Sequence, residues 1–109
     1  MNYYNEISQG YEELYKEEQI KKLNFIKSFL EKLNIKIKES DKLLDVGCGT
    51  GLTTQFWTNK NKTGIDPAKK LIAKAKQKNK SSNYIVAQAE NIPFKDNSFD
   101  IVISITAIQ

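Results

Sequence analysis

Two aspartates and three glycines are the residues of this chain whose types and spacing favour ligand binding. Residues 43–51 read LLDVGCGTG, so that Asp45 lies in an apolar run that leads directly into the glycines. The apolar run predicts a buried strand. Glycine tolerates positive φ and has no Cβ, so the glycines predict a sharp turn with exposed backbone. A helical pattern follows from Leu52, which places the N–H groups of this turn at a helix N-terminus, where polar or anionic groups can bind.

The spacing of the glycines separates this turn from two common phosphate-binding motifs. Dinucleotide-binding folds use G-x-G-x-x-G, whereas here Gly47, Gly49 and Gly51 alternate and Leu52 follows. The P-loop pattern G-x-x-x-x-G-K-[ST] is absent from the sequence. Asp45 repels a pyrophosphate and attracts an ammonium group. The turn is therefore predicted to bind a cationic end of a ligand rather than a diphosphate.

Asp66 supplies a second acidic group, at the end of the predicted strand 62–66. A carboxylate in this position can accept hydrogen bonds from both ribose hydroxyls of a nucleoside, as the acidic residue of dinucleotide-binding folds does. An amino-acid end at Asp45 and a nucleoside end at Asp66 together describe S-adenosylmethionine. The alternative is that Asp66 only caps the predicted helix 68–78, whose first position suits Pro67.

The elements that position these residues alternate between strand and helix. The patterns predict strands over 42–46, 62–66, 84–88 and 99–105 and helices over 52–59 and 68–78. This alternation favours right-handed βαβ crossovers and a parallel sheet flanked by helices. Residues 101–105 are almost continuously apolar, which is typical of a strand covered on both faces.

Before the first strand, apolar residues recur at helical spacing. From residue 11 to 33 they lie three and four positions apart, with Glu and Lys between them. This spacing predicts an amphipathic helix packed on the sheet. Residues 1–10 are polar and aromatic, and we expect them to form a mobile or ligand-capping segment.

The composition limits the chemistry that this chain can perform. All 17 basic residues are lysines, and the chain has no histidine and one cysteine, Cys48. Triads with a His base, His-ligated metal sites and Cys-based metal clusters are excluded for these residues. Residues 60–80 carry eight lysines and one acid, Asp66. A solvated helix face explains this charge better than an RNA-binding surface, because specific phosphate and base recognition prefers arginine.

The overall balance of residue types is that of a soluble globular protein, with 39% hydrophobic and 28% charged residues. No apolar run approaches the roughly 18 residues that span a bilayer. Residues 1–10 have neither the basic nor the apolar region of a signal peptide. These observations predict no membrane partner and a cytoplasmic location.

Three collinear motifs resemble those of class I S-adenosylmethionine-dependent methyltransferases, in the branch called methyltransferase domain 11. Residues 43–51 are similar to the first motif of that family, and residues 64–67 (GIDP) are similar to its acidic second motif. Residues 88–94 (QAENIPF), followed by 98–102 (SFDIV), resemble its adenine loop and fourth strand. The resemblance covers the N-terminal, cofactor-binding half of the family's domain.

The fold that this resemblance implies is a Rossmann-like three-layer α/β/α domain with a parallel sheet. Its strand order is 3-2-1-4, and it occupies residues 41–109 after an N-terminal helical lead-in over residues 1–40. We expect the domain to be incomplete, because the sequence ends soon after the fourth strand. The fourth strand is then an open sheet edge. The expected partner is a second chain, or another copy of this chain, that covers this edge.

The resemblance also implies which residues hold the methionine end of the cofactor. They belong to the first motif and are Asp45, Gly47, Cys48, Gly49 and Gly51. Asp45 is implied to bind the amino group, and the turn to hold the rest of the methionine moiety. Cys48 is expected to fill space in the turn rather than to act as a nucleophile. Neither a catalytic residue nor a metal ligand is assigned.

A second set of residues is implied to surround the nucleoside and the methionine from other strands. Asp66 is implied to bind the ribose, and the backbone of Ala89 to meet the adenine edge. Gln88 stands where the family usually has Asp, and its amide oxygen can accept the same hydrogen bond from the adenine amino group. Glu90 follows in the same loop. Ile105 is implied to line the methionine from the fourth strand.

The function implied is transfer of the methyl group of S-adenosylmethionine to a small-molecule or RNA acceptor, with S-adenosylhomocysteine as product. Tyr4 or Tyr11 is implied to cover the methionine carboxylate. The methyl group is already activated, so alignment of the acceptor and exclusion of water account for most of the catalysis. The alternative is a non-catalytic cofactor-binding or regulatory subunit with a degenerate or split fold. A nicotinamide-dependent oxidoreductase is disfavoured by the glycine spacing.

Overall fold

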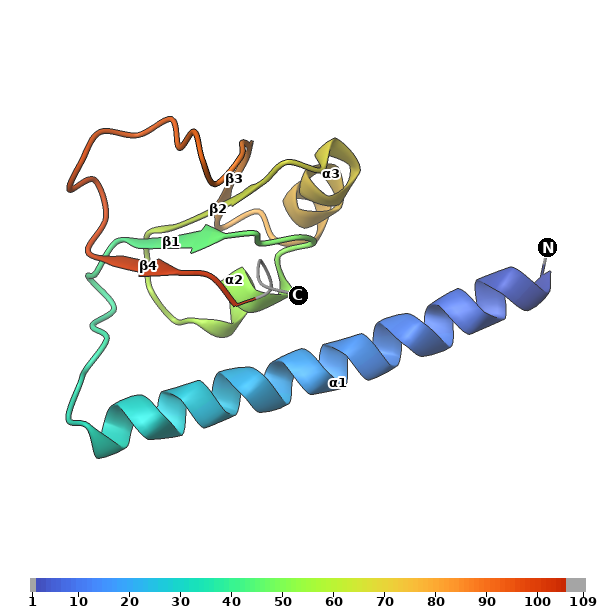
Figure 1. Ribbon diagram of the computed structural model, residues 1–109, viewed down its shortest axis with the longest axis horizontal. Helices are drawn as coiled ribbons and strands as arrows, with labels where there is room; N and C mark the ends of the chain where they lie inside the picture. Colours follow the sequence, from blue (N-terminus) through green and yellow to red (C-terminus); the bar gives the residue numbers. More distant parts are fainter. Residues whose placement is uncertain (1, 106–109) are drawn as a thin grey trace. The chain divides into compact units, whose positions relative to one another are not determined.

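The computed structural model describes residues 2–105, with side chains from residue 13 onward. The chain divides into two compact units, the first ending at Lys36 and the second beginning at Ile37. The first unit consists of one long helix, and the second contains a sheet with two shorter helices (Figure 1).

The first unit is the helix α1 (Asn2–Lys32). It begins at residue 2, so residues 2–10, which contain no proline to prevent a helix, belong to it and do not precede the predicted helix 11–33. Their expected ligand-capping role stays a prediction. Phe25 and Phe29, four positions apart, stack with ring centroids 6.5 Å apart. The helix ends where Asn34 adopts positive φ and the Ile35 N–H bonds the Leu30 carbonyl. No helix over residues 2–105 is long and apolar enough to cross a membrane.

The sheet of the second unit has four parallel strands in the order β3-β2-β1-β4. The strands are β1 (Leu43–Val46), β2 (Lys62–Asp66), β3 (Asn83–Val86) and β4 (Ile101–Ile103). This order confirms the prediction of a Rossmann-like sheet. In the register, Asp45 lies between Gly64 of β2 and Ile103 of β4. The central strand β1 therefore carries Asp45 to the carboxyl end of the sheet, where ligands of such folds bind.

Strand β4 is shorter than the predicted 99–105, and the residues at its start bond to Lys42, the residue before β1. The N–H groups of Asp100 and Ile101 both donate to the Lys42 carbonyl, at 2.9 and 3.0 Å. The Asp100 carboxylate in turn accepts the Lys42 N–H at 2.8 Å. These bonds fix the register of β4 on β1 at the residue before each strand begins.

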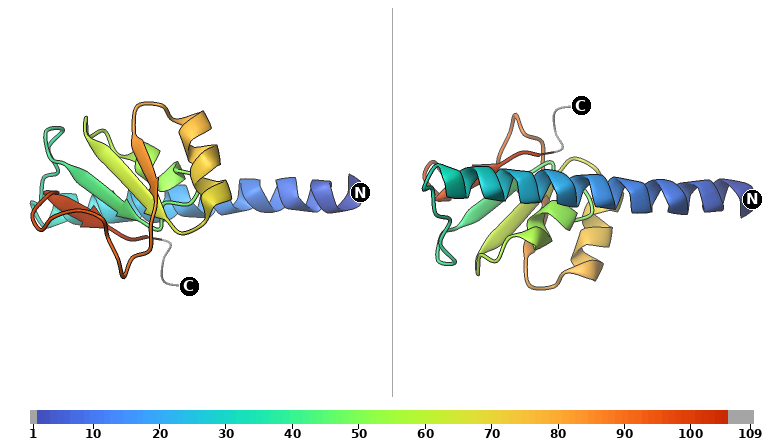
Figure 2. Two further views of the ribbon diagram at one scale, coloured as in Figure 1. Left: turned by 90° about the horizontal axis from the view of Figure 1, so that it is seen from above. Right: turned by 90° about the horizontal axis from the view of Figure 1, so that it is seen from below.

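The two helices of the second unit lie on one face of the sheet (Figure 2). Helix α2 (Leu52–Phe56) is shorter than the predicted 52–59, because Trp57 has an extended backbone. Helix α3 (Lys69–Lys78) packs Ile72 and Ala75 against Tyr84 of β3. In the register of the strands, Tyr84 and Asp45 lie on the same face, both paired with Gly64 of β2.

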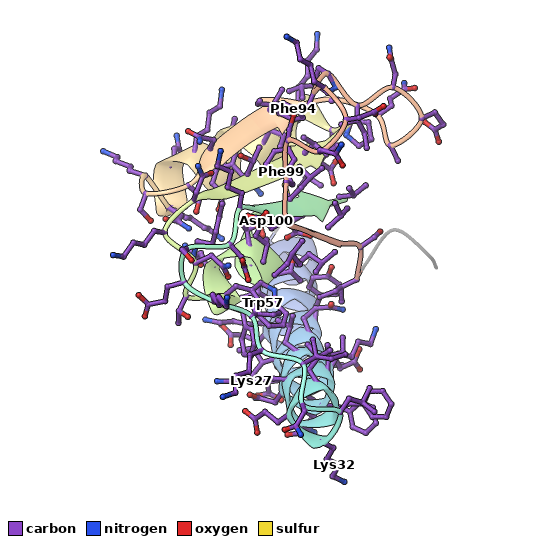
Figure 3. All side chains as sticks on the ribbon, turned by 90° about the vertical axis from the view of Figure 1, so that its left-hand side faces the viewer. Lys27, Lys32, Trp57, Phe94, Phe99 and Asp100 are labelled. Atoms are coloured by element: carbon purple, nitrogen blue, oxygen red, sulfur yellow. The ribbon has the colours of Figure 1, made fainter. Side chains whose placement is uncertain are left out.

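The opposite face of the sheet is covered by the loop between β3 and β4. Phe94 and Phe99 of this loop pack against the cluster of Leu44, Val46 and Ile65. The two rings meet edge to face with centroids 5.1 Å apart, just before Asp100 (Figure 3). Among residues 37–105 no helix covers this face, so the second helical layer of the expected α/β/α arrangement does not occur within this unit's described residues.

Val102 departs from the prediction that the fourth strand is covered on both faces. It is 60% exposed, while Ile101 and Ile103 on the other face are half-buried. In the register Val102 pairs with Leu44, and so it shares the face that the loop covers. The loop rings pack on the cluster around Leu44, and no described part of this unit packs over Val102. The prediction is therefore wrong for this face of β4.

Candidate functional site

Asp45 is a fully buried carboxylate in the central strand. Its Oδ2 accepts hydrogen bonds from the hydroxyls of Thr53 and Thr54 of α2, at 2.5 and 2.7 Å. Its Oδ1 is buried and has no hydrogen-bond partner among the described residues. A buried carboxylate oxygen without a partner is costly to maintain. An ammonium group at Oδ1 would remove this cost, which supports the predicted role of Asp45.

Burial also raises the pKa of Asp45 above its ordinary value of 3.8, against the lowering effect of the two threonine hydroxyls. The folded chain therefore binds this proton more tightly than the unfolded chain. The resulting contribution to stability is complete below pH 3.8 and is lost as the pH rises through the raised pKa.

The direction of this pH dependence gives a prediction for the Asp45→Asn variant, in which residue 45 cannot titrate. The free energy of unfolding of the ligand-free variant, minus that of the wild type, is expected to increase as the pH rises from about 4 to neutrality. Urea denaturation at a series of pH values measures the difference. A difference that is independent of pH would contradict the raised pKa of Asp45.

The glycine turn connects β1 to α2 and is fixed to the end of β2. The N–H groups of Gly47 and Cys48 donate to the Ile65 carbonyl, at 2.9 and 3.0 Å. Gly47, Gly49 and Gly51 have φ values of 76°, 56° and 90°, which other residues rarely adopt. A Cβ added at Gly49 would meet no atom within 4 Å. The turn thus has the predicted left-handed backbone and an open side at Gly49.

Asp66 joins the end of β2 to this turn. Its Oδ2 accepts the Gly49 N–H at 3.1 Å, and its Oδ1 accepts the Ala68 N–H at 2.9 Å. Helix α3 begins after Ala68, so Asp66 binds the backbone just ahead of the helix rather than occupying its N-cap position. Each carboxylate oxygen keeps a further lone pair. Asp66 can therefore hold the turn and still accept hydrogen bonds from ribose hydroxyls.

Cys48 lies inside the turn and is 4% exposed, in a cluster with Ile72, Ala75 and Tyr84. Burial and the nearby charges of Asp45 and Asp66 raise the pKa of its thiol to about 12. Such a thiol stays protonated at neutral pH and is a poor nucleophile. This environment agrees with the expectation that Cys48 fills space.

The residues predicted for the adenine follow β3. The Ala87 N–H bonds the Asp66 carbonyl at 3.1 Å, so the chain passes beside Asp66 just before Gln88. Gln88, Ala89 and Glu90 are exposed, and none of their side chains has a hydrogen bond within the described part of the chain. Their roles stay predictions.

The remaining predicted contacts with the cofactor involve Ile105, Tyr4 and Tyr11. Ile105 is half-buried and lies two residues beyond Ile103, the partner of Asp45 in the register. The side chains of Tyr4 and Tyr11 lie outside the described residues. Within the described part of the chain, no group of His, Cys, Asp and Glu could hold a metal ion.

Sequence reasoning missed three residues of the site, Thr53, Thr54 and Tyr84. The threonines follow the glycine turn at the start of α2, where hydroxyls can reach back to the strand carboxylate. Their position in the first helical turn after an acidic strand was a usable signal. Tyr84 carried no such signal, because its contact with the turn depends on how β3 pairs with β2.

Comparison with known proteins shows to which family this chain belongs. Residues 44–109 match the model of the methyltransferase domain. This chain belongs to that family. The match begins at Leu44 in β1 and includes the glycine turn, Asp66 and the loop before β4. The recognition made from the three motifs is thereby confirmed. The structural neighbours include S-adenosylmethionine-dependent methyltransferases, which confirms S-adenosylmethionine as the family's cofactor.

Three curated relatives illustrate the range within the family. The chain is 35% identical over 102 residues to the uncharacterized protein MJ1252 of Methanocaldococcus jannaschii, covering 94% of this chain and 38% of that protein. It is 38% identical over 69 residues to a malonyl-[acyl-carrier protein] O-methyltransferase of Hamiltonella defensa, covering 62% and 27%. It is 30% identical over 79 residues to the ubiquinone/menaquinone biosynthesis C-methyltransferase UbiE of Campylobacter jejuni, covering 64% and 34%. The chain thus spans well under half of each relative.

Two solved structures agree with the fold. The YcgJ protein of Bacillus subtilis superposes with a TM-score of 0.63 at 25% identity, covering 75% of this chain and 36% of that protein. An S-adenosylmethionine-dependent methyltransferase of Methanosarcina mazei superposes with a TM-score of 0.54 at 28% identity, covering 61% and 37%. The similarity again falls on a part of each larger protein.

Proposed function

We propose that this chain is the cofactor-binding part of a methyltransferase that transfers the methyl group of S-adenosylmethionine to a small-molecule or RNA acceptor. The observation that carries the proposal is the unpartnered Oδ1 of buried Asp45, on the strand that leads into a glycine turn held by Asp66. A cationic amino group near Asp45 and a ribose near Asp66 fit this arrangement. When bound, the cofactor supplies an activated methyl group, and the residues of the chain bind and orient it.

The hydrogen bonds of the two carboxylates support separate binding roles for Asp45 and Asp66. Asp45 Oδ1 receives the amino group of the methionine moiety. The open side of Gly49 allows the methionine moiety to lie against the backbone of the turn. Asp66 receives the ribose hydroxyls with the lone pairs that Gly49 and Ala68 leave free. Gln88, Ala89 and Glu90 follow β3 at the same end of the sheet and receive the adenine.

The acceptor differs among the named relatives, since one is an O-methyltransferase and another a C-methyltransferase. Membership of the family therefore does not by itself define the acceptor. Cytoplasmic location stays a prediction from the sequence.

Calorimetric titration tests the ligand class. We expect saturable binding of S-adenosylhomocysteine and no binding of NAD, because two carboxylates lie where a pyrophosphate would be repelled. Binding of NAD without binding of S-adenosylhomocysteine would contradict the proposal. Production of S-adenosylhomocysteine from S-adenosylmethionine with an acceptor would then separate a methyltransferase from a non-catalytic cofactor-binding subunit.

The alternative of a split or regulatory subunit is favoured by the exposed Val102 on edge strand β4. Exposed apolar edge strands promote pairing with another chain. We therefore propose that β4 is the edge at which a second chain, or a second copy, adds to the sheet.

Sedimentation velocity at increasing protein concentration tests the role of this edge. We expect self-association of the wild type, and we expect Val102→Lys to reduce it because a charge on the edge opposes strand addition. Val86→Lys is the matched control, since Val86 is an exposed valine on β3, at the opposite edge of the sheet. Equal effects of the two substitutions would contradict a specific role of β4.

A further inference from the structure

Tyr84 of β3 is a buried tyrosine whose hydroxyl reaches the start of α2. The residue is 4% exposed and lies on the face of the sheet that carries Asp45. Its Oη accepts a hydrogen bond from Asn79 Nδ2 at 3.2 Å. Burial raises the pKa of this hydroxyl, and the neighbouring side chains of Asn79, Ser82 and Thr54 lower it. The hydroxyl therefore lies between the end of α3 and Thr54 of α2.

The number of protons fixes the direction that a hydrogen bond between Tyr84 and its neighbour Thr54 can take. The Thr54 hydroxyl has one proton and donates it to Asp45 Oδ2 at 2.7 Å. Toward Tyr84 the Thr54 oxygen can therefore only accept, and the Tyr84 hydroxyl can only donate. Asn79 Nδ2 is a donor only, and it occupies a lone pair of the Tyr84 oxygen. The proton of the Tyr84 hydroxyl is thus left to donate toward Thr54, whose own proton goes to Asp45.

The ring of Tyr84 also supports the glycine turn directly. A Cβ added at Gly51 would lie 2.7 Å from Tyr84 Oη and 3.0 Å from Cζ. A Cβ added at Gly64 of β2 would lie 2.9 Å from Tyr84 Cδ1. Two glycines without side chains thus leave the space that the ring fills, between the middle of β2 and the end of the turn.

We propose that Tyr84 is a positioning residue for the methionine end of the bound cofactor. Its hydroxyl orients Thr54, and thereby Asp45, while its ring holds Gly51 in place. The ribose end is held separately, because the Asp66 carboxylate accepts the N–H groups of Gly49 and Ala68, whereas Tyr84 is hydrogen-bonded to Asn79. The identity of the ligand rests on the proposed function. The positioning of the turn and of Thr54 is a property of the ligand-free chain.

The Tyr84→Phe variant keeps the ring and removes the hydroxyl. Its affinities for two ligands, one with and one without the methionine moiety, show which end of the cofactor site the hydroxyl affects. The affinity for S-adenosylhomocysteine is expected to fall about fivefold, the effect of one hydrogen bond. The affinity for adenosine, which lacks the methionine moiety, is expected to stay at the wild-type value. Thr58→Ala, which removes an exposed hydroxyl beyond α2, is the control and should leave both affinities unchanged. Equal losses for both probes, or no loss for S-adenosylhomocysteine, would overturn the proposal.

Amide hydrogen exchange of the ligand-free protein tests the same role without any ligand. In Tyr84→Phe the amides of residues 51–55 are expected to exchange faster, while those of Leu44 and Ile65 keep their wild-type rates. A purely structural role would accelerate exchange throughout the sheet, and that result, or no change at all, would overturn the proposal. If the wild type fails to bind S-adenosylhomocysteine, the proposed function fails, and the exchange rates alone decide the role of Tyr84.

Thr54→Val adds a test of the path through Thr54. If Tyr84 acts on Asp45 through the Thr54 hydroxyl, the variant that combines Tyr84→Phe with Thr54→Val should bind S-adenosylhomocysteine no more weakly than Thr54→Val alone. Additive losses would show that the two hydroxyls act independently and would overturn the proposed path.

Discussion

Replacing Asp66 by alanine is expected to weaken the binding of S-adenosylhomocysteine by about 100-fold or more, since hydrogen bonds to a charged group contribute about 1.5–3 kcal/mol each. The carboxylate is expected to accept two ribose hydroxyls. It also accepts the Gly49 N–H at 3.1 Å, so its removal releases the turn as well. Calorimetric titration of the wild type and Asp66→Ala measures the loss.

Two further variants show whether this loss arises from the position of the carboxylate. Asp96→Ala removes an exposed carboxylate from the loop between β3 and β4 and changes the net charge by the same amount. We expect its affinity to match that of the wild type. Asp66→Asn keeps one oxygen acceptor and should bind with intermediate affinity. Undiminished binding by folded Asp66→Ala would remove Asp66 from the site.

Gly51→Ala is expected to reduce the free energy of unfolding by about 3 kcal/mol, from a strained positive φ and from overpacking. The φ of Gly51 is 90°, and the added Cβ would lie 2.7 Å from Tyr84 Oη. Tyr84 is buried and cannot move aside without losing its hydrogen bond with Asn79 and its packing against Ile72 and Ala75. Urea denaturation at a fixed pH measures the change.

Gly49→Ala is the matched control for this prediction. Gly49 also has positive φ, 56°, but the Cβ would meet no atom within 4 Å. Only the backbone strain remains, so we expect a loss of about 1 kcal/mol. Equal losses for the two variants would show that the contact with Tyr84 contributes nothing to the cost at Gly51.

The sequence was informative where local chemistry decides the structure. The alternating glycines required positive φ at Gly47, Gly49 and Gly51, and the structure has it at all three. The alternation of strands and helices predicted parallel strands with right-handed crossovers. The strand order itself was implied by the resemblance of the three motifs, and the structure has that order. The buried state of Asp45 agreed with its place in an apolar run.

The features that sequence reasoning missed depend on contacts between distant segments. Tyr84 meets Gly51 only because β3 pairs with β2 in one register. The exposure of Val102 could not be inferred from an apolar run, since the run does not reveal which face a loop will cover. The end of α2 at Phe56 was missed because Trp57, whose ring packs edge to face on that of Phe56, continues the apolar pattern although its backbone is extended.

Titration of the isotope-labelled protein with S-adenosylhomocysteine, followed by backbone amide resonances, tests the central claim most directly. The account predicts saturable shifts at the amides of Gly47, Gly49 and Gly51, at Asp66 and Ala68, and over residues 88–90. The exposed lysine-rich side of α3 should show none. Shifts confined to α3, or no saturable shift anywhere in the folded protein, would contradict the assignment of the glycine turn and Asp66 as the cofactor site.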